Sequence, residues 1–175
     1  MVSAKMQIVE LGRLSLRDWA EVIAGEPAPF GEICGELEFQ PKDHHIGVRD
    51  DSGALVAAVG WTVVTLEIEG HSPFEVIGVG ALIVRRDLRC SGLAGPIMDL
   101  LVERSAETGL EFRMLFCEPH LEALYRRRGY ELITDPVWVH QRSGLVRAPL
   151  LAMWRSVRPG GAWPAGSVKV QGLPF

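Results

Sequence analysis

The sequence predicts an α/β (α+β) fold with a mixed, mostly antiparallel sheet of six to seven strands and helices on both faces. Two observations lead to this prediction. Between Ile46 and Val84, strand-like apolar segments are separated only by turns, which suits antiparallel neighbours because parallel strands need a crossover connection. After Val84, two amphipathic helical segments alternate with short strand-like segments. The first observation disfavours the rival fold, a doubly wound parallel sheet.

The elements of the first half follow from apolar periodicity and from turn residues. In order they are a strand over Lys5–Leu11, a helix capped by Ser15, a short acidic helical segment that ends near Pro41, and strands over Ile46–Arg49, Ala54–Leu66 and Glu75–Val84. The last of these strands is almost continuously apolar, which is typical of a strand buried on both faces.

The second half predicts two helices, three strands and a tail. They are a helix over Gly92–Thr108, a strand over Phe112–Cys117, a helix over Pro119–Arg128, strands over Tyr130–Thr134 and Leu150–Arg155, and an ordered tail from about residue 156 to 175. The tail is rich in Pro and Gly but keeps large apolar residues such as Trp163 and Phe175 for burial, which a disordered tail seldom does.

Length and composition predict one domain over residues 1–175. The chain is 47% hydrophobic and 23% charged, which is ordinary for a globular domain of this size. It has no apolar run of the length that a membrane span needs and no signal-peptide pattern at its start. Its net charge of −4 disfavours nonspecific nucleic-acid binding. We therefore expect a soluble cytoplasmic protein without a nucleic-acid or membrane partner.

Charge and cysteine placement narrow the chemistry further. Residues 1–84 carry five basic and thirteen acidic side chains, whereas residues 85–175 carry thirteen basic and nine acidic ones. The basic half can face an anionic cofactor and the acidic half a cationic substrate; a dipolar surface without function is the alternative. The three cysteines and five histidines lack the spacing of a disulfide framework or a metal site, so no metal is expected.

The strongest functional signal follows the apolar strand that ends at Val84. Arg89-x-x-Gly92-x-Ala94 stands at the start of the next helix. Free amides and the positive end of the helix dipole make such a position an anion site. Gly92 and Ala94 are small enough for a pyrophosphate to approach the backbone, and Arg89 can add a charged hydrogen bond. The alternative is an ordinary strand–loop–helix connection, because R-x-x-G-x-A alone is a weak motif.

A second passage makes the first more specific. The helical segment that starts near His120, thirty-one residues after Arg89, contains L-Y-x-x-x-G-Y at Leu124–Tyr130. Over Ala54 to Thr134, the combination of strand, R-x-x-G-x-A, helix, strand and L-Y-x-x-x-G-Y resembles the GNAT superfamily of N-acetyltransferases. The C-terminal tail has a fainter similarity to nodulation acyltransferases and aminoglycoside 2'-N-acetyltransferases.

The resemblance implies an acyl-CoA-dependent N-acyltransferase with acetyl-CoA as cosubstrate and a sheet that splays between Glu75–Val84 and Phe112–Cys117. It implies that backbone groups at Leu82, Ile83 and Val84 pair with pantetheine. It also implies that the loop holds the pyrophosphate with Arg89, Cys90, Ser91, Gly92, Leu93 and Ala94. Tyr125 matches the family tyrosine near the cofactor sulfur, where a phenol can protonate the leaving thiolate; a packing role is the alternative.

The chain departs from the family pattern in two places. The family commonly has an Asn seven residues before this tyrosine, but the chain has no Asn, and Glu118 stands there. Glu118 can act on the acceptor amine as a base or an ammonium anchor, or it can be a carboxylate at a helix start. Many members also carry a general-base Glu on the long strand, where this chain has Gly78 and Gly80. The identity of the base is therefore open, and a water chain can serve.

The sequence thus predicts transfer of an acetyl group to the primary amine of a small cationic acceptor by direct attack. The alternative is a catalytically weak CoA-binding sensor or partner-binding module, which the missing strand glutamate favours. His44 and His45 can line the acceptor site or be exposed polar residues at a strand start, and Cys90 can be reactive or a loop filler. The acceptor, the use of longer acyl chains and the oligomeric state, a homodimer included, are left open.

Overall fold

A computed structural model describes residues 5–175 of the chain. Within these residues it contains ten strands: β1 (Gln7–Leu11), β2 (His44–Arg49), β3 (Leu55–Ile68), β4 (Phe74–Val84), β5 (Phe112–Cys117), β6 (Glu131–Leu132), β7 (Val137–Gln141), β8 (Gly144–Arg147), β9 (Leu151–Ser156) and β10 (Val168–Val170). The helices are α1 (Leu16–Ile23), α2 (Glu32–Gly35), α3 (Ala94–Ala106) and α4 (Glu122–Arg126), with two 3-10 turns, η1 (Arg86–Leu88) and η2 (Pro119–Leu121).

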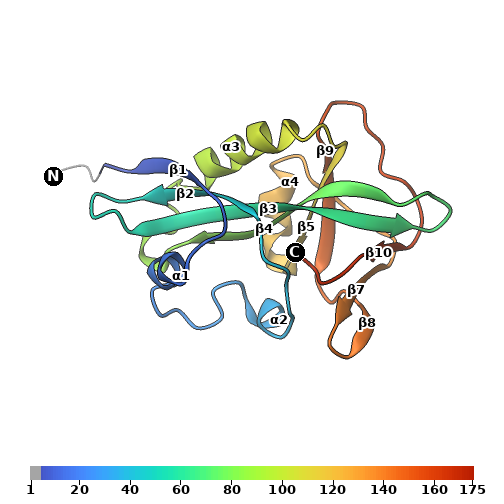
Figure 1. The fold of residues 1–175 in the computed structure, drawn as a ribbon, viewed down its shortest axis with the longest axis horizontal. Helices are drawn as coiled ribbons and strands as arrows, with labels where there is room; N and C mark the ends of the chain where they lie inside the picture. The colour runs from blue at the N-terminus through green and yellow to red at the C-terminus, as the bar shows by residue number, and fades with distance from the viewer. Residues whose placement is uncertain (1–4) are drawn as a thin grey trace.

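All the strands of the described residues belong to one sheet with the order β6-β9-β5-β4-β3-β10-β7-β8, and β2 and β1 extend it from β3 (Figure 1). The long strand β3 has β4 on one edge and two partners on the other. β2 pairs with its first half, and β10, from the C-terminal tail, pairs with its last three residues. The tail is therefore built into the sheet at its centre.

The strand directions confirm the predicted mixed, mostly antiparallel α+β fold. The strands β2, β3 and β4 are antiparallel neighbours, as the short turns between them require. The parallel pairs are β4–β5, which α3 connects, and β7–β10. The sheet has ten strands rather than six to seven because the sequence did not predict β7, β8 and β10; β8 has four residues and β10 three, which is too short for periodicity to reveal.

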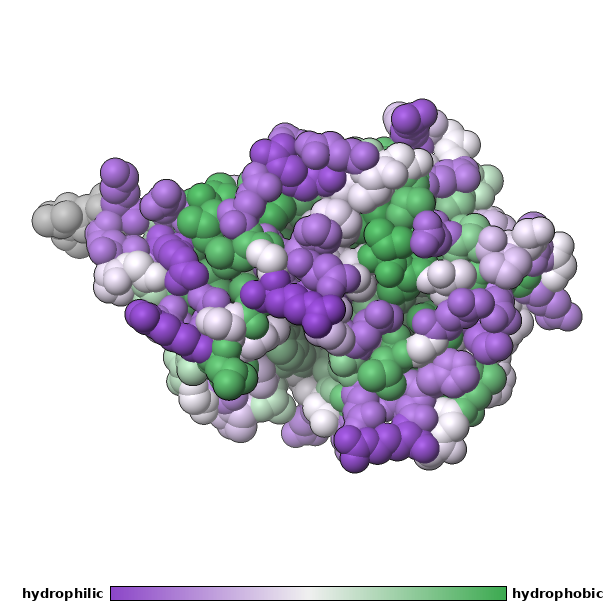
Figure 2. Space-filling model, in the orientation of Figure 1, coloured by the Kyte–Doolittle hydropathy of each residue, from purple (hydrophilic) through white to green (hydrophobic). Residues whose placement is uncertain are grey.

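Helices α1 and α3 cover opposite faces of the sheet (Figure 1). Val22 of α1 packs with Leu55 and Ile83, whereas Ile97 and Leu101 of α3 belong to a separate cluster that includes Val59 and Val79. Polar side chains gather along the top of the view in Figure 2, where α3 lies in Figure 1. The apolar faces of both helices are thus buried against the strands, as amphipathic helices require.

Local signals fix where the helices begin. Ser15 caps α1 in a capping box with Asp18, and the Asp18 carboxylate also accepts a hydrogen bond from Arg49 on β2 at 2.7 Å. α3 begins at Ala94, directly after the loop that carries the predicted anion site. None of the helices in the described range is long and apolar enough to cross a membrane.

Candidate active site

The sheet opens between β4 and β5. The two strands pair only from Ile77–Arg113 to Val79–Leu115. Beyond Val79, β4 continues to pair with β3, and its register shifts between Ala58 and Gly60. Opposite this shift Ala81 has a left-handed backbone with φ of 54°, which marks a β-bulge. From Gly80 onward, the edge of β4 that faces β5 therefore has backbone groups without a strand partner.

A cleft of about 680 Å³ lies at this opening. Its first wall consists of the predicted cofactor side: the end of β4 with Leu82, Ile83 and Val84, then Arg89, and Tyr125 from α4. An aromatic wall of the cleft is formed by Trp19 of α1, by Phe30 and Phe39 from the chain between α1 and β2, and by Phe175 from the C-terminus, with Phe116 of β5 also in the lining. Phe175 lies directly over Gly78 of β4. The same cleft thus contains predicted cofactor residues and aromatic side chains.

The structure separates the predicted cofactor residues into two groups. Leu82, Ile83, Val84 and Arg89 line the cleft. The other predicted residues, which are Cys90, Ser91, Gly92, Leu93 and Ala94, lie beside it in the turn that leads into α3 and do not line it. Gly92, with φ of 86°, adopts a backbone that favours glycine, and Cys90 adopts it as well with φ of 62°. The turn thus leads directly into the start of α3, where backbone amides have no partner within the helix.

Arg89 makes an ion pair with a residue that is distant in the sequence. Its guanidinium forms a two-pronged contact with the carboxylate of Glu26, in which Nη1 donates at 2.8 Å, and its Nε donates to the Val84 carbonyl at 3.1 Å. Arg89 is therefore oriented at the end of β4, but an anion bound there has to compete with Glu26.

Tyr125 is buried, and it lines the cleft at the end of α4. Its ring packs edge to face against Tyr130 with centroids 5.9 Å apart. Burial strongly raises the pKa of the Tyr125 hydroxyl, so this group keeps its proton throughout the neutral range. Tyr125 therefore packs in the core and also lines the cleft, so its position is compatible with either of the two alternatives, packing or catalysis.

Glu118 ties the two walls together. Its Oε1 accepts hydrogen bonds from the amides of Ile33 at 2.9 Å and Cys34 at 3.4 Å, at the start of α2. A side chain at Gly31 would collide with this carboxylate, because a Cβ there would lie 2.2 Å from Oε1. The second oxygen, Oε2, lies 3.6 Å from Nδ1 of His120. One oxygen is thus committed to holding the α2 segment in place, and the residue also lines the cleft.

Lys42 lies in the site together with His45, but the sequence indicated only the histidine. Both are buried in the cleft wall, with exposed fractions of 6% and 3%. The His45 Nδ1 lies 2.7 Å from the Gly12 carbonyl, so Nδ1 carries the proton, while Nε2 is buried without a partner in the described residues. Burial lowers the pKa of His45. In the sequence, Lys42 is marked only by its place between the aromatic residue Phe39 and the following strand.

His44 faces away from this site and stacks on Trp61 with centroids 4.2 Å apart. Gly78 and Gly80, which stand where the family resemblance implies a general-base glutamate, are covered by Phe175 and Lys42. A Cβ at Gly78 would meet the ring of Phe175, and one at Gly80 would meet Cε of Lys42 at 2.8 Å. No side-chain carboxylate is among the nearest neighbours of these two glycines, but the main-chain carboxyl group of Phe175, the last residue of the sequence, lies over Gly80, with its carbon 3.0 Å from the position of a Cβ.

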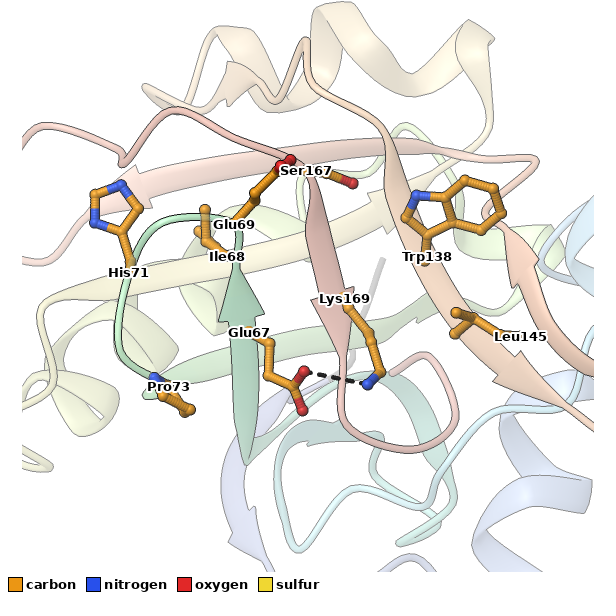
Figure 3. Close-up of a pocket in the computed structure, with 9 residues that line it drawn as sticks. All are labelled: Glu67, Ile68, Glu69, His71, Pro73, Trp138, Leu145, Ser167 and Lys169. Atoms are coloured by element: carbon orange, nitrogen blue, oxygen red, sulfur yellow. Dashed lines mark hydrogen bonds and ion pairs between the residues drawn. The ribbon is translucent and has the colours of Figure 1, made fainter.

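A second hollow lies at the far end of the sheet, between the end of β3, β10 and the β7–β8 hairpin (Figure 3). An ion pair of 3.1 Å joins Lys169 to Glu67 there, and Trp138 and Leu145 form its apolar side. It contains none of the predicted site residues. Within residues 5–175, no group of three or more His, Cys, Asp or Glu residues could hold a metal ion.

Comparison with known proteins identifies the family. A search of the curated proteins finds no match. The family model described as an acetyltransferase (GNAT) domain matches residues 16–133. Among solved structures, the chain is similar to a GNAT family N-acetyltransferase (YhbS) from Escherichia coli in complex with CoA, at 15% identity and a TM-score of 0.61, covering 99% of this chain and 98% of the other.

N-acetylglutamate synthase from Neisseria gonorrhoeae, complexed with coenzyme A and N-acetyl-glutamate, is similar at 10% identity and a TM-score of 0.57. That match covers 87% of this chain and 35% of the synthase. At these identities the structural matches establish the fold, while the family match covers well over half of the sequence. The chain therefore belongs to the GNAT family and is an acetyltransferase whose cosubstrate is acetyl-CoA.

Proposed function

We propose that this chain transfers the acetyl group of acetyl-CoA by direct attack to the primary amine, cationic in solution, of a small acceptor. One observation carries the proposal: a single cleft is lined by the open end of β4 and Tyr125 together with aromatic side chains that include Trp19 and Phe30. Residues 1–175 act as one acyltransferase domain in the cytoplasm, as their composition predicts.

In this proposal, backbone groups of Leu82, Ile83 and Val84 bind the pantetheine arm of the cosubstrate. The unpaired edge of β4 beyond Val79 supports this assignment, because buried backbone groups need hydrogen-bond partners. The turn from Arg89 to Ala94 binds the pyrophosphate through its amides and the Arg89 guanidinium. The position of this turn at the start of the thirteen-residue helix α3 supports the anion site.

Direct attack is favoured over a covalent acyl-enzyme. Two thiols line the cleft, Cys34 and Cys117. Burial raises the pKa of Cys34 to about 11 and that of Cys117 to about 12. Both thiols therefore stay protonated at neutral pH, and a protonated thiol is a poor nucleophile. The acceptor nitrogen itself attacks the thioester carbonyl.

Tyr125 acts as the general acid that protonates the departing thiolate. Its burial and its place on the cofactor wall support this role. Glu118 acts as an anchor for the acceptor ammonium through Oε2, since Oε1 already holds the α2 segment. The aromatic wall, in which Trp19 and Phe30 pack edge to face at 6.2 Å, favours an acceptor with an apolar or aromatic part.

Thiol release from acetyl-CoA across a panel of amines tests the proposal. The panel holds spermidine, kanamycin, phenylalanine, phenethylamine and a short peptide with a free amino terminus. We expect turnover with at least one amine and an acetylated product by mass spectrometry. Tight CoA binding with no turnover on any amine contradicts the proposal and favours the alternative, a CoA-binding sensor or partner-binding module.

A further inference from the structure

Lys42 lies in a groove that two glycines create in the sheet. Gly60 of β3 and Gly80 of β4 face each other as a cross-strand pair. A Cβ at Gly60 would lie 2.7 Å from Cγ of Lys42, and a Cβ at Gly80 would lie 2.8 Å from its Cε. The lysine side chain therefore crosses both strands where only glycine leaves room, and it lines the cleft together with Ala81, the bulge residue.

The Lys42 amine is buried without an ion pair. Its Nζ donates to the Gln40 carbonyl at 3.1 Å, and the ion pairs of the described residues include none with Lys42. Desolvation is the largest cause that lowers its pKa to about 8, with Asp43 opposing the change. The charges of Lys42 and His45 influence each other. The main-chain carboxyl group of Phe175 lies over Gly80 beside Lys42 without an ion pair to it. The other charged or titratable groups of the cleft are Arg13, Arg89, Glu118, His120, Tyr125 and the two thiols.

We propose that Lys42 is the general base that takes a proton from the ammonium group of the acceptor in the cleft. The inference rests on the proposed acetyl transfer. Neutral Nζ uses its lone pair for this proton, while its hydrogen bond to Gln40 keeps the amine in place. Over Gly80, the lysine occupies the space above β4 where a side chain from the strand itself would otherwise point.

The proton balance of the reaction is simple. One proton moves from the acceptor ammonium to Nζ and from there to solvent. The neutral amine then forms a C–N bond with the thioester carbonyl carbon, and the C–S bond breaks. The nitrogen loses its second proton to solvent as the amide forms. The departing thiolate gains a proton from Tyr125, and a proton from solvent restores the tyrosine. The net products are the amide, free CoA and one proton.

Two neighbouring groups are less suited to this task. His45 Nε2 also has a lone pair, but the atom is covered within the protein and lies over Gly60. Glu118 is held by two backbone amides through one oxygen. Lys42 is thus the buried base of the cleft that combines a free lone pair in its neutral form with a titration close to the neutral range.

Three variants test the inference with the best amine of the five-member panel as the probe. Lys42→Met and Lys42→Arg should both lower kcat about a hundredfold at pH 8, since general-base catalysis contributes about 10²- to 10⁴-fold. Their CoA affinity and melting temperature verify that they fold. Lys169→Met removes a lysine of the distant hollow in Figure 3 and should keep wild-type turnover. Arginine keeps the charge but cannot release its proton at this pH.

The pH profile and a direct titration complete the test. Wild-type turnover should rise with an inflection near pH 8 that both Lys42 variants lack. The chain has three lysines, Lys5, Lys42 and Lys169, so carbon-13 NMR of labelled lysine can follow each one. We expect the Lys42 signal to titrate near pH 8.

Each contrary outcome has its own meaning. Wild-type turnover in Lys42→Arg means that the charge matters and overturns the role as a base. Wild-type turnover in Lys42→Met, or a Lys42 signal that titrates near pH 10, overturns the inference as well. In these cases the acetyl transfer itself stands. No turnover by the wild-type protein on any of the five amines overturns the proposed function and this inference with it.

Discussion

At the scale of single residues, the two tyrosines of the chain form a matched pair for testing general acid catalysis. Tyr125 lines the cleft, and Tyr130, its edge-to-face neighbour at 5.9 Å, does not. Tyr125→Phe keeps the ring and removes the proton donor, so kcat should fall about a hundredfold, while acetyl-CoA affinity and melting temperature stay near wild type. Tyr130→Phe removes a buried hydroxyl without a partner and should keep full turnover. Full turnover in Tyr125→Phe would show that the hydroxyl is dispensable.

Arg89 offers a second test at this scale, because Glu26 occupies its guanidinium. Glu26→Gln should tighten CoA binding about two- to fivefold, since it frees Arg89 and removes a negative charge near the proposed pyrophosphate site. The gain is small because the Arg89 side chain is 40% exposed. Isothermal titration at low and high salt measures it, with Glu107→Gln, on the exposed end of α3, as the control. Unchanged or weaker CoA binding in Glu26→Gln contradicts the assignment of Arg89 to the pyrophosphate.

At the scale of elements, the Gly60–Gly80 pair shapes strands β3 and β4 around the cleft. Gly80→Ala places a methyl group 2.8 Å from Cε of Lys42 and 3.0 Å from the main-chain carbon of Phe175. We expect a loss of about 1–3 kcal/mol in the free energy of unfolding and a lower kcat. Gly12→Ala, whose Cβ would have 3.8 Å to its nearest neighbour, should change neither quantity much. Urea unfolding and thiol release measure both, and a fully stable, fully active Gly80→Ala would refute this packing.

The Asp18 carboxylate links helix α1 to Arg49 of β2, and its ionisation contributes to the stability of the fold. Hydrogen bonds from Ser15, ahead of the contact with Arg49, lower the pKa of Asp18 to about 2. A carboxyl pKa that is lower in the folded state stabilises the fold above its unfolded value, and this stability is lost as pH falls towards 2. Asp18→Asn should therefore reduce the free energy of unfolding by about 2 kcal/mol at pH 7, and the difference should shrink below pH 4. Denaturant unfolding at both pH values checks this; a constant difference would contradict it.

The same scale shows what the sequence could predict. Elements with local signals were predicted within a few residues: β5 has the predicted bounds Phe112–Cys117, and the Ser15 cap opens α1. The opening of the sheet also lies where the family resemblance places it, after Val79. Two short strands were not predicted from the sequence. β10 is a strand because it pairs with the distant strands β3 and β7, and β8 has only four residues, which pair with the preceding strand β7.

At the scale of the whole molecule, the candidate site divides in the same way. The lining residues proposed to bind the cofactor lie in short motifs on β4 and α4, so the sequence predicted them. The rest of the lining is assembled from distant segments, with Trp19 of α1, Lys42 before β2 and Phe175 at the end of the sequence. The Glu26–Arg89 and Glu118–Ile33 contacts join positions more than sixty residues apart. No short pattern encodes such contacts, so the sequence alone could not point to Lys42 as a candidate base.

Segments from the whole length of the chain line the cleft, so a cosubstrate bound there should stabilise the whole fold. A ligand present at one hundred times its Kd stabilises the native state by about 2.7 kcal/mol. For a domain of this size, 1 kcal/mol corresponds to about 2–4 °C in Tm, so CoA at that concentration should raise Tm by about 5–10 °C. Arg89→Ala should weaken CoA about ten- to a hundredfold and reduce the shift at the same CoA concentration, because a charged hydrogen bond is worth about 1.5–3 kcal/mol. The shift with a pantetheine analogue that lacks the pyrophosphate should be the same for both proteins. A thermal scan with each ligand measures the four shifts, and equal losses with both ligands would mean that Arg89 supports the fold of the turn before α3 and not the pyrophosphate.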